Sequence, residues 1–144
     1  MKNLIITEKD LNNKLLPHVV LDKDAEVFKI YGTIFEEYNV ISSHFDIIFN
    51  WLKNYLIDAN EFSNFYLCFN KPNTYAIQNW IIRLLYSINE IPVVKIYWLF
   101  EEGDYDTEED IEDLIIETKI NIIAKKIPKE ELIQFKASYY LPEL

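Results

Sequence analysis

Residues 65–88 of the 144-residue chain, FYLCFNKPNTYAIQNWIIRLLYSI, predict a buried strand, a polar turn and a buried helix in succession. The aromatic, apolar run 65–69 is typical of a strand, and Pro72 ends it because proline cannot donate to a sheet ladder. Asn73 or Thr74 then offers a side-chain oxygen to the open N–H groups of a helix start. One apolar stripe at helical spacing follows: Ile77, Ile81, Leu84, Leu85 and Ile88. Such a turn lies at the rim of a sheet, where functional residues gather.

The composition is that of a folded, acidic chain. Half of the residues are hydrophobic and 15% are aromatic, enough for a core at this length. The net charge of -10 argues against a nucleic-acid partner. The single cysteine, Cys68, excludes an internal disulfide and is expected to be buried rather than reactive. The sequence has no apolar run of transmembrane length and no signal-peptide core at its start, so we expect a cytoplasmic protein without membrane insertion.

Three further strands are predicted before the central stretch. Residues 4–6 predict an edge strand and residues 19–21 a second, for which Pro17 favours an edge position. Residues 27–31 alternate along a strand, and Gly32 closes it where a positive φ or a close backbone approach is expected. One face of that strand holds Val27, Lys29 and Tyr31.

The next predicted elements alternate between helix and strand. Residues 33–41 are predicted to be irregular, and Ser42 or Ser43 to cap a helix. The apolar side chains of that helix recur every three or four residues: Phe45, Ile48, Phe49, Leu52, Tyr55 and Leu56. Residues 93–100 predict a strand covered on both faces, since their apolar character is nearly continuous.

The last part of the chain adds a helix, a strand and a further helix. Thr107 and Asp110 form a capping-box-like helix start. The inner face of this helix carries Ile111, Leu114, Ile115 and Thr118. Residues 120–124 predict a last strand and residues 130–144 one more helix. The order implies right-handed βαβ crossovers, and hence an α/β fold with a single mixed sheet whose helices pack mainly on one face.

The sequence offers little material for enzyme chemistry. His18 and His44 are far apart and have no metal-ligand spacing. Gly32 and Gly103 are the only glycines, so no glycine-rich phosphate loop exists. We therefore predict no enzyme, no catalytic residue, no cofactor and no metal site.

An acidic stretch follows the strand at residues 93–100. Residues 101–113 hold nine acids and no base. Asp104 and Asp106 superficially resemble a calcium loop, but the glycine and the closing glutamate are out of place. The stretch is either a solvated helix start matched to the helix dipole or a partner surface.

Thr74 also has two interpretations. As a plain N-cap it is worth about 1 kcal/mol to the helix and needs no further function. As a phosphoacceptor it would hold its added charge over open N–H groups at a helix N-terminus, where anions are stabilised.

Several motifs in order make the chain resemble the SiaC family of bacterial regulatory phosphoproteins, from about residue 17 to residue 127. The most specific is WLFEEGDYD at residues 98–106, followed by Glu112 and Asp113. Gly32 with Glu37 is similar to the glycine and Pro-Glu element of the family, and residues 51–55 to the end of its first helix. Phe69 and Asn70 are similar to the start of its Asn-Thr-x-Ser-Ser turn.

The resemblance implies a switch protein with a STAS-like fold, similar to anti-sigma-factor antagonists. Family members are phosphorylated on the threonine of the turn by a SiaB-type protein kinase, and a PP2C-like phosphatase removes the phosphate. The unphosphorylated form binds and activates a diguanylate cyclase, which links the family to c-di-GMP signalling and biofilm regulation. A phosphate in the turn adds bulk and charge to a docking surface.

This sequence departs from the family at the turn itself. Without gaps, Lys71 takes the position of the family's threonine and Thr74 that of its second serine. Either Thr74 has become the acceptor, or this member is locked in one state.

The sequence thus predicts one SiaC-like domain over residues 1–144, with a core at about 17–127 and a C-terminal extension at 128–144. Its first function hypothesis is a partner-switching regulator, and the alternative is a STAS-like module that binds a small ligand or forms oligomers without phosphorylation. The predicted partner-binding turn consists of Asn70, Lys71, Asn73, Thr74 and Tyr75, with Thr74 as the phosphorylation candidate. Secondary partner-binding positions are Gly32, Glu36, Glu37, Glu101, Glu102, Asp104 and Asp106.

Overall fold

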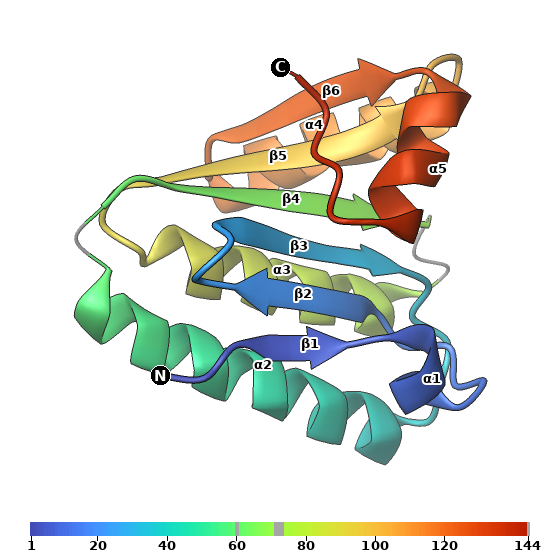
Figure 1. The fold of residues 1–144 in the computed structure, drawn as a ribbon. Helices are drawn as coiled ribbons and strands as arrows, with labels where there is room; N and C mark the ends of the chain where they lie inside the picture. The colour runs from blue at the N-terminus through green and yellow to red at the C-terminus, as the bar shows by residue number, and fades with distance from the viewer. Residues whose placement is uncertain (60, 71–73, 144) are drawn as a thin grey trace.

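The computed structural model describes residues 1–59, 61–70 and 74–143, with a six-stranded mixed sheet at its centre (Figure 1). Its strands are β1 (Leu4–Ile6), β2 (His18–Asp22), β3 (Val27–Gly32), β4 (Ser63–Phe69), β5 (Val94–Glu101) and β6 (Ile122–Ile127). They lie side by side in chain order, β1 to β6. Strand β2 is antiparallel to both of its neighbours, β1 and β3, while β3 to β6 are mutually parallel. The predicted α/β fold with a single mixed sheet is confirmed.

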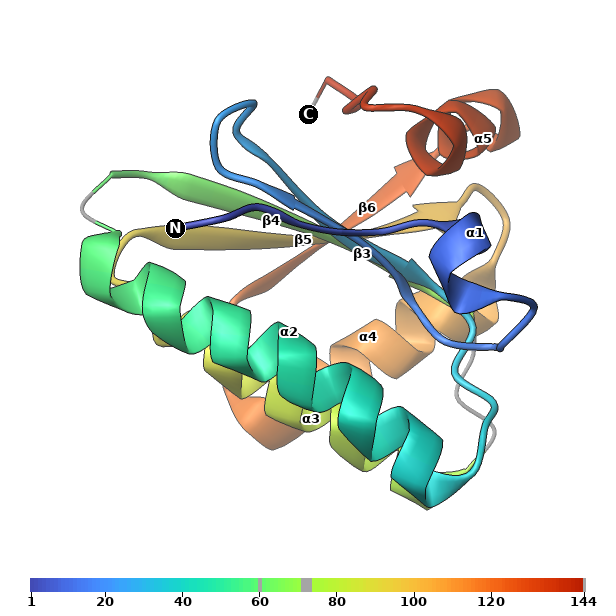
Figure 2. The same ribbon diagram turned by 60° about the horizontal axis from the view of Figure 1, so that its bottom comes forward.

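Three helices connect the parallel strands and cover one face of the sheet. They are α2 (Tyr38–Asp58), α3 (Tyr75–Asn89) and α4 (Tyr105–Thr118). Each crossover leads to the next strand in the same direction, and right-handed crossovers of this kind place every helix on the same side. Figure 2 shows these helices on one side of the sheet and α5 (Lys129–Ala137) on the other. The prediction that the helices pack mainly on one face is confirmed.

The main core fills the space between the sheet and these three helices. Phe65 on β4 is fully buried, and its ring stacks on that of Phe28 from β3 with centroids 4.9 Å apart. Phe45 on α2 stacks on Trp80 of α3 at 5.3 Å. Aromatic rings therefore join the strands to one another and the two longest helices to each other.

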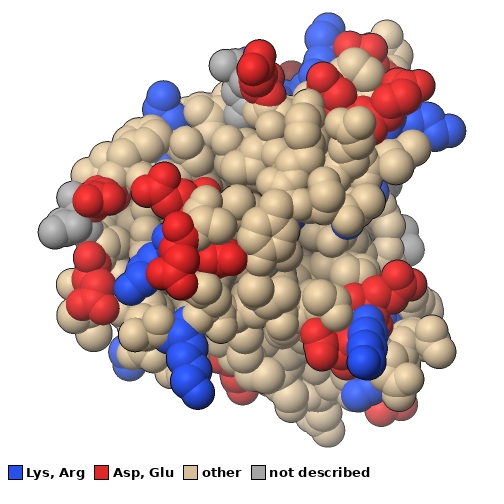
Figure 3. Space-filling view, viewed as in Figure 1, with Lys and Arg blue, Asp and Glu red and all other residues tan. Residues whose placement is uncertain are grey.

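A second, smaller core lies under α5 on the opposite face. Phe135 of α5 is fully buried there and lies against Tyr31, with ring centroids 5.6 Å apart. Charged side chains lie mainly around the border of this side of the molecule, and its centre is uncharged (Figure 3). The Nζ of Lys29, a side chain only 1% exposed, donates to the carbonyl of Phe135 at 2.6 Å and also to that of Ser138. Tyr31 donates to the carbonyl of Lys136 at 2.7 Å. Lys29 and Tyr31 thus hold the carbonyl end of α5 on the sheet.

The start of α2 was predicted wrongly. The helix begins at Tyr38, not after Ser42 or Ser43, and its N-cap Glu37 forms no side-chain cap hydrogen bond. Ile41 is buried four residues before Phe45, so it adds a turn to the apolar stripe. Because no side chain caps α2, the packing of its first turn against the core, through Ile41, accounts for the start of the helix at Tyr38.

Several smaller predictions about the strands and helices also need correction. Strand β2 is paired on both sides and is not an edge strand. Pro17 does not prevent this pairing, because it precedes the first residue of the strand and removes no ladder hydrogen bond. Strand β5 is only partly covered, since Lys95 is exposed. Strand β6 is Ile122–Ile127 rather than residues 120–124, and α5 ends at Ala137 rather than at residue 144. A short helix, α1 (Glu8–Leu11), lies in a segment for which no helix was predicted.

Candidate functional site

The parallel strands β3, β4 and β5 all end at one edge of the sheet (Figure 1). We call this side, formed by residues 32–38, 69–70, 74–76 and 101–107, the carboxyl edge. Open α/β sheets place their binding sites outside the carboxyl ends of the strands. Nearly all predicted site residues lie here: Gly32, Glu36, Glu37, Asn70, Thr74, Tyr75, Glu101, Glu102, Asp104 and Asp106. Lys71 and Asn73 were predicted as well, but they lie outside the described residues.

Asn70 ties the β4–α3 turn to the loop after β3. Its backbone N–H donates to the carbonyl of Gly32 at 3.1 Å. Its side-chain Nδ2 donates to the hydroxyl of Thr33. Asn70 is thus held against the loop after β3 by two hydrogen bonds.

Gly32 has a backbone conformation that favours glycine. Its φ is 126°, a conformation that side chains with a Cβ rarely adopt. A Cβ at this position would come within 3.4 Å of Nδ1 of His18, whose ring stacks on Tyr31 at 4.9 Å. The predicted positive φ at Gly32 is confirmed.

Thr74 is the N-cap of α3, as one of its two interpretations required. Its backbone is extended, with φ -134° and ψ 155°, and its Oγ1 accepts a hydrogen bond from the N–H of Ile77 at 3.2 Å. The side chain is exposed, and the first turn of α3 contains no acidic residue. The hydroxyl is accessible and points to the positive end of a helix dipole.

The two glutamates after Gly32 have different surroundings. Glu36 is half-buried, and its Oε2 accepts a hydrogen bond from the N–H of Leu15 at 2.8 Å. Glu37 is exposed at the N-cap of α2. Glu36 thus supports the loop, whereas the carboxylate of Glu37 lies at the surface.

Asp104 caps α4, so the predicted capping box at Thr107 and Asp110 was wrong. The carboxylate of Asp104 accepts hydrogen bonds from the N–H of Thr107 at 3.2 Å and from its hydroxyl at 2.6 Å. A hollow of about 350 Å³ lies beside this cap. It is lined by Asn70 from the turn, by Glu101, Asp104 and Asp106, and by Lys136 of α5. The hollow brings the acidic stretch next to the turn.

Replacing Asp104 with alanine is expected to lower the free energy of unfolding by about 1 kcal/mol, because the N-cap of α4 is lost. The exposed Glu102, for which alanine removes a charge but no cap, provides the matched control. Urea denaturation followed by circular dichroism measures both variants. Equal effects of the two substitutions would contradict the capping role.

Among the described residues, Cys68 is not an activated nucleophile, and no cluster of side chains could bind a metal ion. Cys68 is buried as predicted, and burial raises the pKa of its thiol to about 11, so it is protonated at neutral pH. His44 is buried, and its Nε2 lies 2.9 Å from the carbonyl of Pro17. Burial also lowers the pKa of His44, so its ring is neutral at neutral pH. Within residues 1–59, 61–70 and 74–143, no three His, Cys, Asp or Glu side chains form a group that could hold a metal ion.

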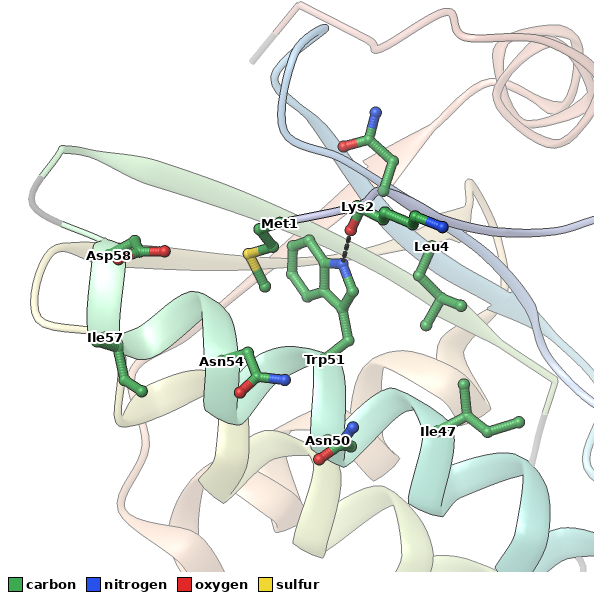
Figure 4. Close-up of a pocket in the computed structure, with 10 residues that line it drawn as sticks. Met1, Lys2, Leu4, Ile47, Asn50, Trp51, Asn54, Ile57 and Asp58 are labelled. Carbon is green, nitrogen blue, oxygen red and sulfur yellow. Dashed lines mark hydrogen bonds between the residues drawn. The ribbon is translucent and has the colours of Figure 1, made fainter.

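A separate groove of about 530 Å³ lies between the N-terminal segment and α2 (Figure 4). Trp51 forms its floor and donates from Nε1 to the carbonyl of Lys2 at 2.8 Å. Ile47 and Ile57 line its α2 side and are more than half exposed. Sequence reasoning missed this groove, because no motif marks it. It includes none of the predicted site residues.

Comparison with known proteins identifies the family. A model of the SiaC family, described as SiaC family regulatory phosphoprotein, matches residues 11–126, which include the whole carboxyl edge. No curated protein and no solved structure matches the chain. In the part of the chain that the structure describes, no helix is both long and apolar enough to cross a membrane. Since the matched range covers most of the sequence, the chain belongs to the SiaC family of regulatory phosphoproteins.

Proposed function

We propose that this protein is a partner-switching regulator whose state is set by phosphorylation of Thr74. Membership of the SiaC family makes it a non-enzymatic regulatory phosphoprotein. In this proposal a SiaB-type kinase adds the phosphate in the cytoplasm and a PP2C-like phosphatase removes it. The unphosphorylated form binds an effector, such as a diguanylate cyclase in c-di-GMP signalling. The exposed hydroxyl of Thr74 at the N-terminus of α3 is the observation that carries the proposal.

Phosphate fits this position for an electrostatic reason. The open N–H groups of the first turn of α3 and the helix dipole both favour an anion. No acidic side chain in that turn opposes it. The phosphoryl oxygens can replace Oγ1 as acceptors for the N–H of Ile77, so modification need not cost the helix its cap.

The position also explains how a phosphate would alter docking. Asn70 is hydrogen-bonded to the loop after Gly32. In this proposal the docking surface includes that loop and the start of α3 at Thr74, and the phosphate adds charge and bulk to it. Partner proteins that contact both segments would sense the modification.

Phosphosite mapping by mass spectrometry, after co-expression with a SiaB-type kinase, tests the proposal. We expect a phosphate on Thr74, the only serine or threonine in residues 69–76, and none on this peptide in Thr74→Ala. Thr7→Ala is the matched control, since Thr7 is also an exposed threonine at a helix N-cap. The control variant should accept phosphate at Thr74 as the wild type does. Phosphorylation elsewhere with an unmodified Thr74 would contradict the proposal.

The groove beside Trp51 supports the second candidate, a STAS-like module that binds a small ligand. Nucleotides that raise the melting temperature of the wild type but not of Trp51→Ala would favour it. Under the first proposal, nucleotides leave the melting temperature unchanged.

A further inference from the structure

The most exposed aromatic side chains of the described residues gather on the carboxyl edge. Phe35 is 60% exposed, Tyr38 68%, Tyr75 75% and Tyr105 76%. The next most exposed aromatic side chain is Phe62 at 54%, which directly precedes β4 and therefore lies at the opposite end of that strand from the carboxyl edge. Large aromatic groups are costly to leave in water and are enriched where proteins bind one another. We call these four residues the aromatic rim.

The positions of the three tyrosines are not explained by folding. Each of the helices α2, α3 and α4 begins with one of them, Tyr38, Tyr75 and Tyr105. Tyrosine is no capping residue and has only moderate helix propensity. Tyr38 lies against Trp80 with centroids 5.7 Å apart and still exposes most of its ring. Tyr38 thus packs on the core with part of its ring, and the exposed parts of all three rings offer surface to another molecule.

The charge around the rim indicates what that molecule carries. Residues 32–38 and 101–107 contain no lysine or arginine. They contain six carboxylates, which outnumber the single base Lys136 in the hollow beside Asp104: Glu36, Glu37, Glu101, Glu102, Asp104 and Asp106. An aromatic face flanked by carboxylates suits a guanidinium or ammonium group, which stacks on the ring and pairs with the acid. The same charge disfavours nucleic acid and anionic membranes.

We infer that the aromatic rim binds a cationic, arginine-rich segment of a partner protein. The inference rests on the proposed function in one respect, that the carboxyl edge is the partner-binding surface of the unphosphorylated form. Arginine side chains of the segment stack on Tyr75 and Tyr105, and the neighbouring carboxylates Glu37, Glu102 and Asp106 pair with its charges. Charge complementarity of this kind accelerates association and selects the partner.

Selection from a phage-displayed library of random peptides on the immobilised unphosphorylated protein tests this inference. We expect the enriched peptides to carry a net positive charge and arginine. For a synthetic copy of the most enriched peptide, Tyr75→Ala with Tyr105→Ala should raise the Kd about tenfold or more. Tyr75→Phe with Tyr105→Phe keeps both rings and should change the Kd less than about twofold, because phenylalanine also supports cation–π contacts. Added salt should weaken the complex.

Ile57 and Ile116 provide a control for the loss of exposed apolar surface, since they are 79% and 75% exposed and lie outside the rim. Alanine at both positions should leave the Kd unchanged. Enrichment of neutral or acidic peptides, or equal binding by the tyrosine and isoleucine double variants, would overturn the inference. These outcomes are separate from phosphorylation. If Thr74 accepts phosphate while the selected peptides are not cationic, only the rim inference fails. If Thr74 accepts none while cationic peptides require the rim, only the phosphoswitch fails.

Discussion

Replacing Phe65 with alanine is expected to lower the free energy of unfolding by about 3–5 kcal/mol, the usual cost of deleting a fully buried aromatic ring. Phe65 lies at the centre of the main core, where its ring stacks on Phe28 and meets Tyr55 at 6.5 Å. Its strand is paired on both sides, so the surrounding backbone cannot easily collapse into the cavity. Urea denaturation at equilibrium measures the change.

Phe35→Ala is the matched control for this prediction. It removes the same side chain from a position that is 60% exposed, and we expect a change below about 0.5 kcal/mol. A loss at Phe65 no larger than the loss at Phe35 would mean that the packing of the main core is misassigned.

Replacing Lys29 with alanine is expected to cost about 3 kcal/mol or more. The substitution leaves a cavity in the second core and deprives the buried carbonyl of Phe135 of its donor. The Nζ also lies 4.7 Å from the centre of the Phe135 ring, so a cation–π contact is lost. Hydrogen exchange of α5 amides measures the local effect, and α5 should exchange faster than the helices on the other face. Unchanged exchange in α5 would contradict its attachment through Lys29.

The same lysine predicts a pH dependence of stability. Burial lowers the pKa of Lys29 to about 8 from 10.5 in the unfolded chain. Between these values the unfolded chain binds a proton that the folded chain has released, so the free energy of unfolding rises with pH. The rise should be clearest from pH 8 to 9, because above pH 9 ionisation of Cys68 in the unfolded chain opposes it. Lys29→Met, which fills most of the space without a titratable group, should lose this rise. A Lys29→Met variant with the same pH profile as the wild type would contradict the assignment.

Much of the fold could be predicted because hydrophobic periodicity is a local signal. The strand at residues 65–69, the stripe from Ile77 to Ile88 and the Thr74 cap are confirmed within β4 and α3. What the sequence could not supply was tertiary context. The start of α2 depends on the burial of Ile41 in a core that also contains side chains of α3. Lys29 was correctly assigned to one strand face, but no local pattern indicates that distant carbonyls of α5 accept its hydrogen bonds.

In the candidate site, too, the residues could be predicted from the sequence but their tertiary contacts could not. The residues at the carboxyl edge were predictable, since the chain places them directly after the parallel strands of the mixed sheet. Their contacts were not, because the bond of Asn70 to Gly32 and the cap of Asp104 on Thr107 depend on loop geometry. Of the aromatic rim, only Tyr75 was among the predicted site residues, because three tyrosines at separate helix starts form no sequence motif. They become a set only when the topology brings the helix starts to one edge.

Hydrogen–deuterium exchange of the unphosphorylated protein, with and without a SiaB-type kinase, tests most directly whether the carboxyl edge binds the partner. We expect slower exchange on binding in residues 33–38, 69–76 and 101–107, with no change in the residues that line the groove between β1 and α2 or in α5. Slower exchange confined to that groove or to α5, with the three segments unaffected, would contradict it.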